Sequence, residues 1–122
     1  MKLTIETNEK KFFRQLLEIL SSIPPLNKLR PKELDLLAII MYYNNIYKDL
    51  DPSLRQRVLN SKATKKEIRE IAGMNENVFN TNIFILRKNN LVSKSGELIG
   101  ALQIFPKDSF KIEFQFNIEK NV

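Results

Sequence analysis

The stretch EIREIAGMNENVFN, residues 67–80, places a glycine between two segments that both have helical spacing. Gly73 follows the apolar residues Ile68 and Ile71, and glycine is the residue most often found just past a helix end in the left-handed conformation. Asn75 can then cap a second helix through its side-chain oxygen. The stretch predicts two helices joined by about three residues, a linker so short that they must cross steeply, as in a helix-turn-helix.

Each of the two helices has its own signals. The first is expected over residues 65–72, because Thr64 and Glu67 match the capping box T-x-x-E. The second is expected over ENVFNTNIFILRKN, residues 76–89. Apolar side chains recur on one face of this second helix, which should point into the core and consists of Phe79, Ile83 and Leu86.

Strands are expected after the second helix. Asn90 can adopt the left-handed conformation that ends the helix. Residues 91–104 then read as a hairpin around a tight turn at Ser95 and Gly96. Further on, apolar and polar residues alternate strictly, which predicts a strand with one buried face. The apolar residues of that face are Phe110, Ile112, Phe114, Phe116 and Ile118.

The residues before position 62 are expected to be mainly helical. Residues 2–6 alternate polar and apolar and can form a short strand. Three helices should follow, each beginning at a capping residue or a proline: residues 9–20 after Asn8, 31–50 from Pro31, and 52–60 after Asp51. The helix from Pro31 is the most apolar, so we expect it to form the centre of the core.

Length and charge fit one domain with an uneven surface. A chain of 122 residues with 43% apolar content can build a core without disulfides or metal. We expect a single domain, 1–122, in which residues 1–61 are helical, residues 62–105 form the helix-turn-helix region and residues 106–122 contain a C-terminal strand. The net charges are +3 for residues 1–61, +4 for 62–94 and −1 for 95–122. The middle region is therefore the one most suited to an anionic partner.

Composition argues against several classes of function. The chain has no His and no Cys, so it lacks the usual general base, the thiolate nucleophile and the common transition-metal ligands. The three glycines, at positions 73, 96 and 100, make no phosphate-binding loop. Apolar runs stay below the ~18 residues of a membrane span, and the N-terminus lacks a signal-peptide core. We expect a non-enzymatic, cytoplasmic protein with no cofactor, no metal and no membrane partner.

The run TKKEIREIAGMNENVFNTNIFILRKNNLV, residues 64–92, resembles the winged helix-turn-helix superfamily. That family shows a capped helix, a small-residue turn, a second helix and an ending L-x-x-x-G-L-I. Here the ending is LRKNNLV, with Asn90 in place of the glycine. The resemblance covers about residues 62–105. It implies an α+β fold, mostly α: a winged helix-turn-helix with N-terminal helices, a β-hairpin wing and an additional C-terminal strand.

The resemblance also implies a duplex DNA partner, with residues 76–89 as recognition helix and 91–104 as wing. Asn side chains can bond adenine edges, and Arg or Lys side chains suit phosphates. Phe84 could contact a thymine methyl, pack on another protein chain or tuck under the wing. The alternative is an ordinary solvated face. The candidate nucleic-acid contacts are Lys65, Lys66, Arg69, Asn77, Asn80, Thr81, Phe84, Arg87, Lys88 and Lys94.

Two functions are consistent with these patterns. The first is a DNA-binding regulator of transcription or replication, acting as a homodimer through the first helix or the last strand. The second is an assembly protein that uses the same fold inside a larger particle, for example a tailed-phage virion or head-to-tail connector, in which case it would reside in the virion. The apolar face of the last strand could close over the first helix and pair with residues 2–6, or it could form a subunit interface, because an exposed strand invites a neighbouring chain. The candidate interface residues are Phe110, Ile112, Phe114 and Phe116.

Overall fold

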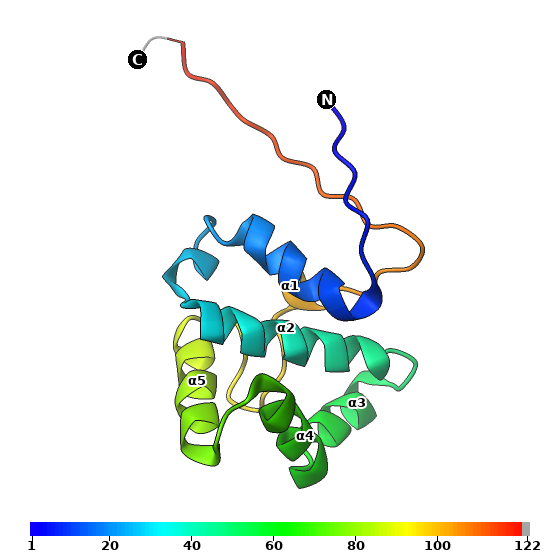
Figure 1. The fold of residues 1–122 in the computed structure, drawn as a ribbon, viewed down its shortest axis with the longest axis vertical. Helices are drawn as coiled ribbons and strands as arrows, with labels where there is room; N and C mark the ends of the chain where they lie inside the picture. The colour runs from blue at the N-terminus through cyan, green and yellow to red at the C-terminus, as the bar shows by residue number, and fades with distance from the viewer. Residues whose placement is uncertain (121–122) are drawn as a thin grey trace.

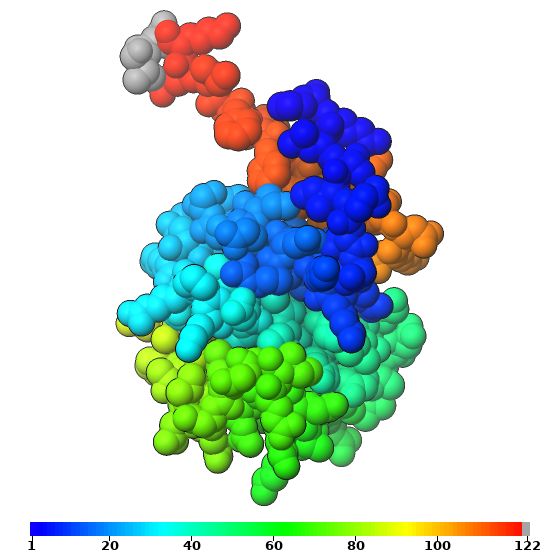
Figure 2. Space-filling model, viewed as in Figure 1, coloured from blue at the N-terminus to red at the C-terminus, as the bar shows by residue number. Residues whose placement is uncertain are grey.

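The computed structural model describes residues 1–120 and shows a chain built from helices (Figure 1). In chain order, the described residues form α1 (Glu9–Leu20), η1 (Leu26–Lys28), α2 (Pro31–Ile46), α3 (Pro52–Leu59), α4 (Lys62–Ala72), α5 (Glu76–Lys88) and η2 (Gly100–Leu102), where η marks a 3₁₀ helix. The two ends of the chain, residues 1–7 and 110–120, lie outside these helices. Both project from the helical body on the side of α1 (Figures 1 and 2).

Helix α2 is the centre of the core, as its sequence predicts. It carries apolar residues on nearly all sides, and Leu36 and Leu37 are completely buried. It contacts α1, α3, α4 and α5. The helix ends at Ile46 rather than near residue 50, because the chain turns over the next four residues before α3 begins at Pro52.

Helix α1 lies antiparallel to α2 and covers one side of it. Asn8 caps α1 as predicted, with its side-chain oxygen accepting a hydrogen bond from the Lys11 N–H. The buried face of α1 consists of Phe13, Leu16 and Leu17. Two polar contacts fix the pairing of the helices: Arg14 Nε lies 2.6 Å from Asp35 Oδ1, and Asn45 Nδ2 donates to Glu9 Oε1 at 2.9 Å.

The caps of α3 and α4 confirm one prediction and correct another. The Asp51 carboxylate accepts from the Leu54 N–H, so α3 begins as expected. Helix α4, however, is capped by Ser61 and not by Thr64: the Ser61 hydroxyl oxygen accepts from the Thr64 N–H at 3.2 Å. Only Asn60 and Ser61 separate α3 from α4. Asn60 ends α3 as its C-cap and Ser61 caps α4, so α4 begins three residues earlier than predicted.

The predicted α+β fold with a β-hairpin wing is wrong. Residues 1–120 contain no β-sheet, and the hairpin is reduced to one isolated antiparallel bridge between Val92 and Leu98. Leu91, Val92 and Leu98 are buried in the helical core instead of lining a pair of strands. What would have been the second strand ends in the 3₁₀ turn η2, which buries Leu102.

The two predicted terminal strands are also not formed. Residues 2–6 and 110–119 have no regular secondary structure and no ladder partner within the described chain, and their side chains are exposed. The period-two alternation is present in the sequence, but a strand is stable only beside another strand or against a packed surface. One contact ties the C-terminal segment to the body: the rings of Phe110 and Phe12 of α1 meet edge to face, with centroids 5.2 Å apart.

Candidate nucleic-acid interface

The junction between α4 and α5 is held by backbone hydrogen bonds around Gly73. This residue is left-handed, with φ of 68°, as the sequence predicted. Its N–H donates to the Glu70 carbonyl at 3.1 Å, and the N–H of Met74 donates to the Arg69 carbonyl at 3.0 Å. Met74 is buried, so it supplies the hydrophobic contact typical of such a helix end. The direction of α5 relative to α4 is therefore set within three residues.

Helix α5 is anchored at its start and along its inner face. The Asn75 side chain caps it by accepting from the Val78 N–H at 2.9 Å, as predicted. Phe79 and Leu86 are buried on the inner face. Asn82, which the sequence analysis did not single out, is buried as well: its amide donates to the Val78 carbonyl at 3.0 Å and lies 3.5 Å from Met74 Sδ. It links the turn to the second helix.

The outer face of α5 carries all six of the side chains predicted to contact DNA from this helix. Each of them is exposed: Asn77, Asn80, Thr81, Phe84, Arg87 and Lys88. The Thr81 hydroxyl donates to the Asn77 carbonyl at 2.9 Å, so its oxygen is left to accept a bond but not to give one. Phe84 is 63% exposed and is not covered by the loop after α5. The arrangement agrees with the predicted face, and its binding role stays a prediction.

Helix α4, on the other side of the turn, also exposes basic side chains. Lys65 and Lys66 are exposed and Arg69 is half-buried. Ion pairs within the described chain join Arg14 to Glu18 and to Asp35, and none involves a basic residue of 62–94. Burial raises the pKa of Tyr43 on α2, and the nearby carboxylate of Glu67 raises it further, so this acidic residue of α4 faces α2. The cationic charge of α4 is thus not neutralised by close carboxylates.

The loop after α5 is fastened to α3 rather than free to act as a wing. The Ser95 carbonyl accepts two bonds, from Gln56 Nε2 at 2.8 Å and from Asn60 Nδ2 at 2.7 Å. Gly96 has φ of 85°, and a Cβ there would lie 2.7 Å from Asn60 Oδ1, so the turn requires glycine. Lys94, the predicted wing contact, is exposed in this loop. No local sequence pattern predicts this seam of hydrogen bonds, since it depends on how α3 and the loop meet in space.

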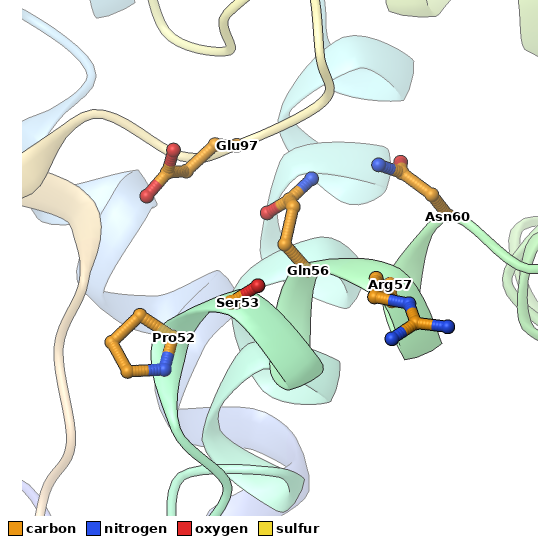
Figure 3. Close-up of a pocket in the computed structure, with 6 residues that line it drawn as sticks. All are labelled: Pro52, Ser53, Gln56, Arg57, Asn60 and Glu97. Atoms are coloured by element: carbon orange, nitrogen blue, oxygen red, sulfur yellow. The ribbon is translucent and has the colours of Figure 1, made fainter.

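A shallow open hollow of about 620 Å³ lies along the same seam (Figure 3). It is lined by Pro52, Ser53, Gln56, Arg57, Asn60 and Glu97. The Gln56 and Asn60 side chains reach from α3 toward the loop, and they are already engaged by Ser95. The hollow is therefore a by-product of the hydrogen bonds that hold the loop against α3. In the portion of the chain that the structure describes, no group of three or more acidic residues is arranged to hold a metal ion.

The predicted interface residues lie away from α4 and α5. Phe110, Ile112, Phe114 and Phe116 belong to the exposed C-terminal segment on the side of α1 (Figure 1). Phe110 packs on Phe12 of α1, and Ile112 is exposed to a similar extent, 38% against 42% for Phe110. The structure thus separates the candidate DNA-contacting face from the candidate interface.

The chain was compared with family models, with curated proteins and with solved structures, and none of the three comparisons gave a match. Within residues 1–120, none of the helices combines the length and apolar character that crossing a bilayer requires. The resemblance to the winged helix-turn-helix superfamily thus rests on the sequence pattern alone. The predicted β-hairpin wing is not formed.

Proposed function

We propose that this chain is a small non-enzymatic protein that binds duplex DNA through α4, the turn and α5, and that it regulates transcription or replication. One observation carries the proposal: α5 exposes a polar and basic face, and α4, joined to it by a turn fixed by its own hydrogen bonds, exposes lysines that form no ion pair within residues 1–120. Such a junction can present one helix to the major groove while the other lies against the backbone.

The roles of individual side chains follow from their places on the helix. Recognition helices contact base edges mainly through their N-terminal half, which here exposes Asn77 and Asn80. Asn can bond N6 and N7 of adenine at once, so this half can carry sequence preference. Lys65 and Lys66 on α4 are suited to phosphates, which position the protein without reading sequence.

Some features of the helix oppose this role or have another explanation. Glu76 lies in the first turn of α5, where a carboxylate stabilises the helix dipole but repels phosphates. Arg87 and Lys88 lie in the last turn, where cations stabilise the same dipole. The proposal therefore depends on Asn77, Asn80 and the α4 lysines. The loop fastened to α3 can add only the exposed Lys94.

The test is a titration of the full chain with random duplex DNA at several salt concentrations. Each phosphate contact contributes about −0.9 to the slope of log K against log salt. The double variant Lys65→Gln/Lys66→Gln should make the slope shallower by about 2, since each lost contact reduces it by about 1. The matched control, Lys10→Gln/Lys11→Gln, removes the same charge from an exposed site on α1. Equal losses from the two variants, or no binding by the parent chain, would reject the proposed surface.

The exposed apolar groups favour a second candidate function, that of a subunit in a larger protein assembly. Phe84 on α5 and the apolar side chains of residues 110–118 stand in water in the single chain, and such groups commonly mark protein contacts. Under this function Phe84→Asp and Phe114→Asp should abolish association with the partner chain. If both variants recover partners as the parent does, the assembly function loses its support.

A further inference from the structure

The C-terminal segment, residues 111–119, carries large apolar side chains that the rest of the molecule covers only in part, as at Ile112 and Phe114, or hardly at all, as at Phe116 and Ile118. The segment leaves the body beyond Phe110 and extends into solvent (Figures 1 and 2). The exposed fractions of its apolar side chains run from 38% for Ile112 to 83% for Phe116. Leaving such side chains in water is unfavourable compared with burying them. The segment is therefore a candidate contact surface, and its sequence indicates what would cover it.

The segment is nearly symmetric about its central residue. It reads KIEFQFNIE, with Gln115 at the centre. Phe114 and Phe116 flank the centre, and Ile112 and Ile118 stand three residues from it on either side. At the ends of the segment, Lys111 and Glu119 carry opposite charges. A segment of this kind is complementary to itself when it runs in the opposite direction.

Antiparallel pairing with a second copy, centred on Gln115, satisfies every position of the segment. Lys111 of each copy then lies opposite Glu119 of the other, and Glu113 lies opposite Asn117. On the other face of the ribbon, Ile112 lies opposite Ile118 and Phe114 opposite Phe116. Opposite charges and paired apolar or aromatic side chains at directly facing positions are the stabilising cross-strand pairs.

Neighbouring registers are less favourable. If the centre moves to Phe116, Glu113 of one copy faces Glu119 of the other, and if it moves to Glu113, the two Glu113 side chains face each other. Like charges directly opposite are destabilising. A centre at Phe114 leaves Lys111 without an acidic partner. The pattern of charges therefore selects the register centred on Gln115.

We propose that residues 111–119 pair with the same residues of a second copy as a two-stranded antiparallel ribbon, with the two-fold axis at Gln115. Among residues 1–120 of the single chain there is no strand edge for this segment to join, and a second copy supplies one. An isolated ribbon is only marginally stable, so the helical bodies must contribute. Phe110, packed on Phe12 of α1, holds the start of each strand against its own body. The proposal is independent of DNA binding.

A charge exchange tests the register. The mass of the full chain is measured by light scattering over a range of concentrations. Lys111→Glu and Glu119→Lys each replace two attractive pairs by two repulsive ones, so each should raise the dimer dissociation constant by about tenfold or more. The double variant Lys111→Glu/Glu119→Lys restores both attractions and should return to the parent value. Lys107→Glu, an equal charge change at an exposed site before the ribbon, is the matched control and should have little effect.

A single introduced cysteine tests the axis, because the natural chain has none. Two copies of Gln115→Cys face each other in the ribbon and should form a disulfide-linked dimer under mild oxidation. In Glu113→Cys the two thiols are about four residues apart along the ribbon, roughly 14 Å, which is beyond disulfide reach. This variant should stay unlinked. Circular dichroism is used to check that each variant keeps its helices.

Three results would overturn the proposal. The first is the mass of one chain at every concentration. The second is a dimer in which Lys111→Glu behaves like Lys107→Glu, since that dimer would use another surface. The third is equal cross-linking of Gln115→Cys and Glu113→Cys.

Discussion

Gly73 is the residue at which the direction of α5 is set. Replacing it isolates the free-energy cost of placing a residue with a Cβ in the left-handed conformation. Gly73→Ala should lower the free energy of unfolding by about 1–2 kcal/mol, because a residue with a Cβ is strained in the left-handed region. No atom lies within 4 Å of the added Cβ, so the effect comes from the backbone alone. Denaturant unfolding measures it. Gly100→Ala is the control: it also has open space but no positive φ, and its stability should hardly change. Equal effects would contradict the argument.

At the same scale, Asn80 tests whether α5 reads bases and Arg87 tests whether the end of the helix contacts phosphates. If DNA binding is sequence-preferring, Asn80→Ala should weaken binding to a selected duplex by about 1–3 kcal/mol, as expected for loss of a base contact. Arg87→Ala should weaken specific binding as well, while both variants keep the fold because both side chains are exposed. Fluorescence anisotropy gives the affinities. Asn27→Ala and Arg57→Ala make the same changes at exposed sites on η1 and α3 and should bind as the parent does. Unchanged affinity in the α5 variants would mean that this helix does not contact the DNA.

At the scale of the element, the cap of α4 distinguishes the observed helix start from the predicted one. Ser61→Ala should destabilise the protein by about 1 kcal/mol, the usual effect of losing a cap. Thr64→Val should have a smaller effect, because it retains the backbone N–H that Ser61 caps and loses only the hydroxyl contact with Ser61 at 3.0 Å. Thermal unfolding of the two variants gives the order. The reverse order would mean that Thr64 is the functional cap.

The elements that could be predicted from the sequence are those set by neighbouring residues. The caps at Asn8, Asp51 and Asn75 and the left-handed Gly73 all depend on contacts within a few residues, and all are confirmed. The strand predictions are wrong because a strand needs a neighbouring strand or a packed surface, and alternation of polar and apolar residues does not supply one. The seam of Gln56 and Asn60 on Ser95 joins residues more than thirty positions apart, so no local pattern could reveal it. For the candidate site, the exposed face of α5 could be predicted, whereas the inward role of Asn82 could not.

At the scale of the whole molecule, the fold separates two surfaces that can act together. The α4–α5 face lies at one side of the body, and the C-terminal segment leaves from the side of α1 (Figure 1). Central helix α2 contacts α1, α4 and α5, so one packed core lies between the two surfaces. A dimer formed through residues 111–119 would carry two α4–α5 faces, and under the proposed DNA-binding function these would bind paired half-sites, as dimers of helix-turn-helix proteins do.

Ending the chain after Phe110 tests this connection. The shortened chain should keep its helices for two reasons. Residues 111–120, which the truncation removes, are exposed, and the contact of Phe110 with Phe12 remains. It should have the mass of one chain and bind a duplex with one selected site as the parent does. For a duplex with two suitably spaced sites, its affinity should fall at least about tenfold, since the parent's second contact is intramolecular. Circular dichroism, light scattering and anisotropy measure the three properties. A shortened chain that still prefers paired sites would place the subunit contact elsewhere, and one that loses its helices would show that the segment supports the core.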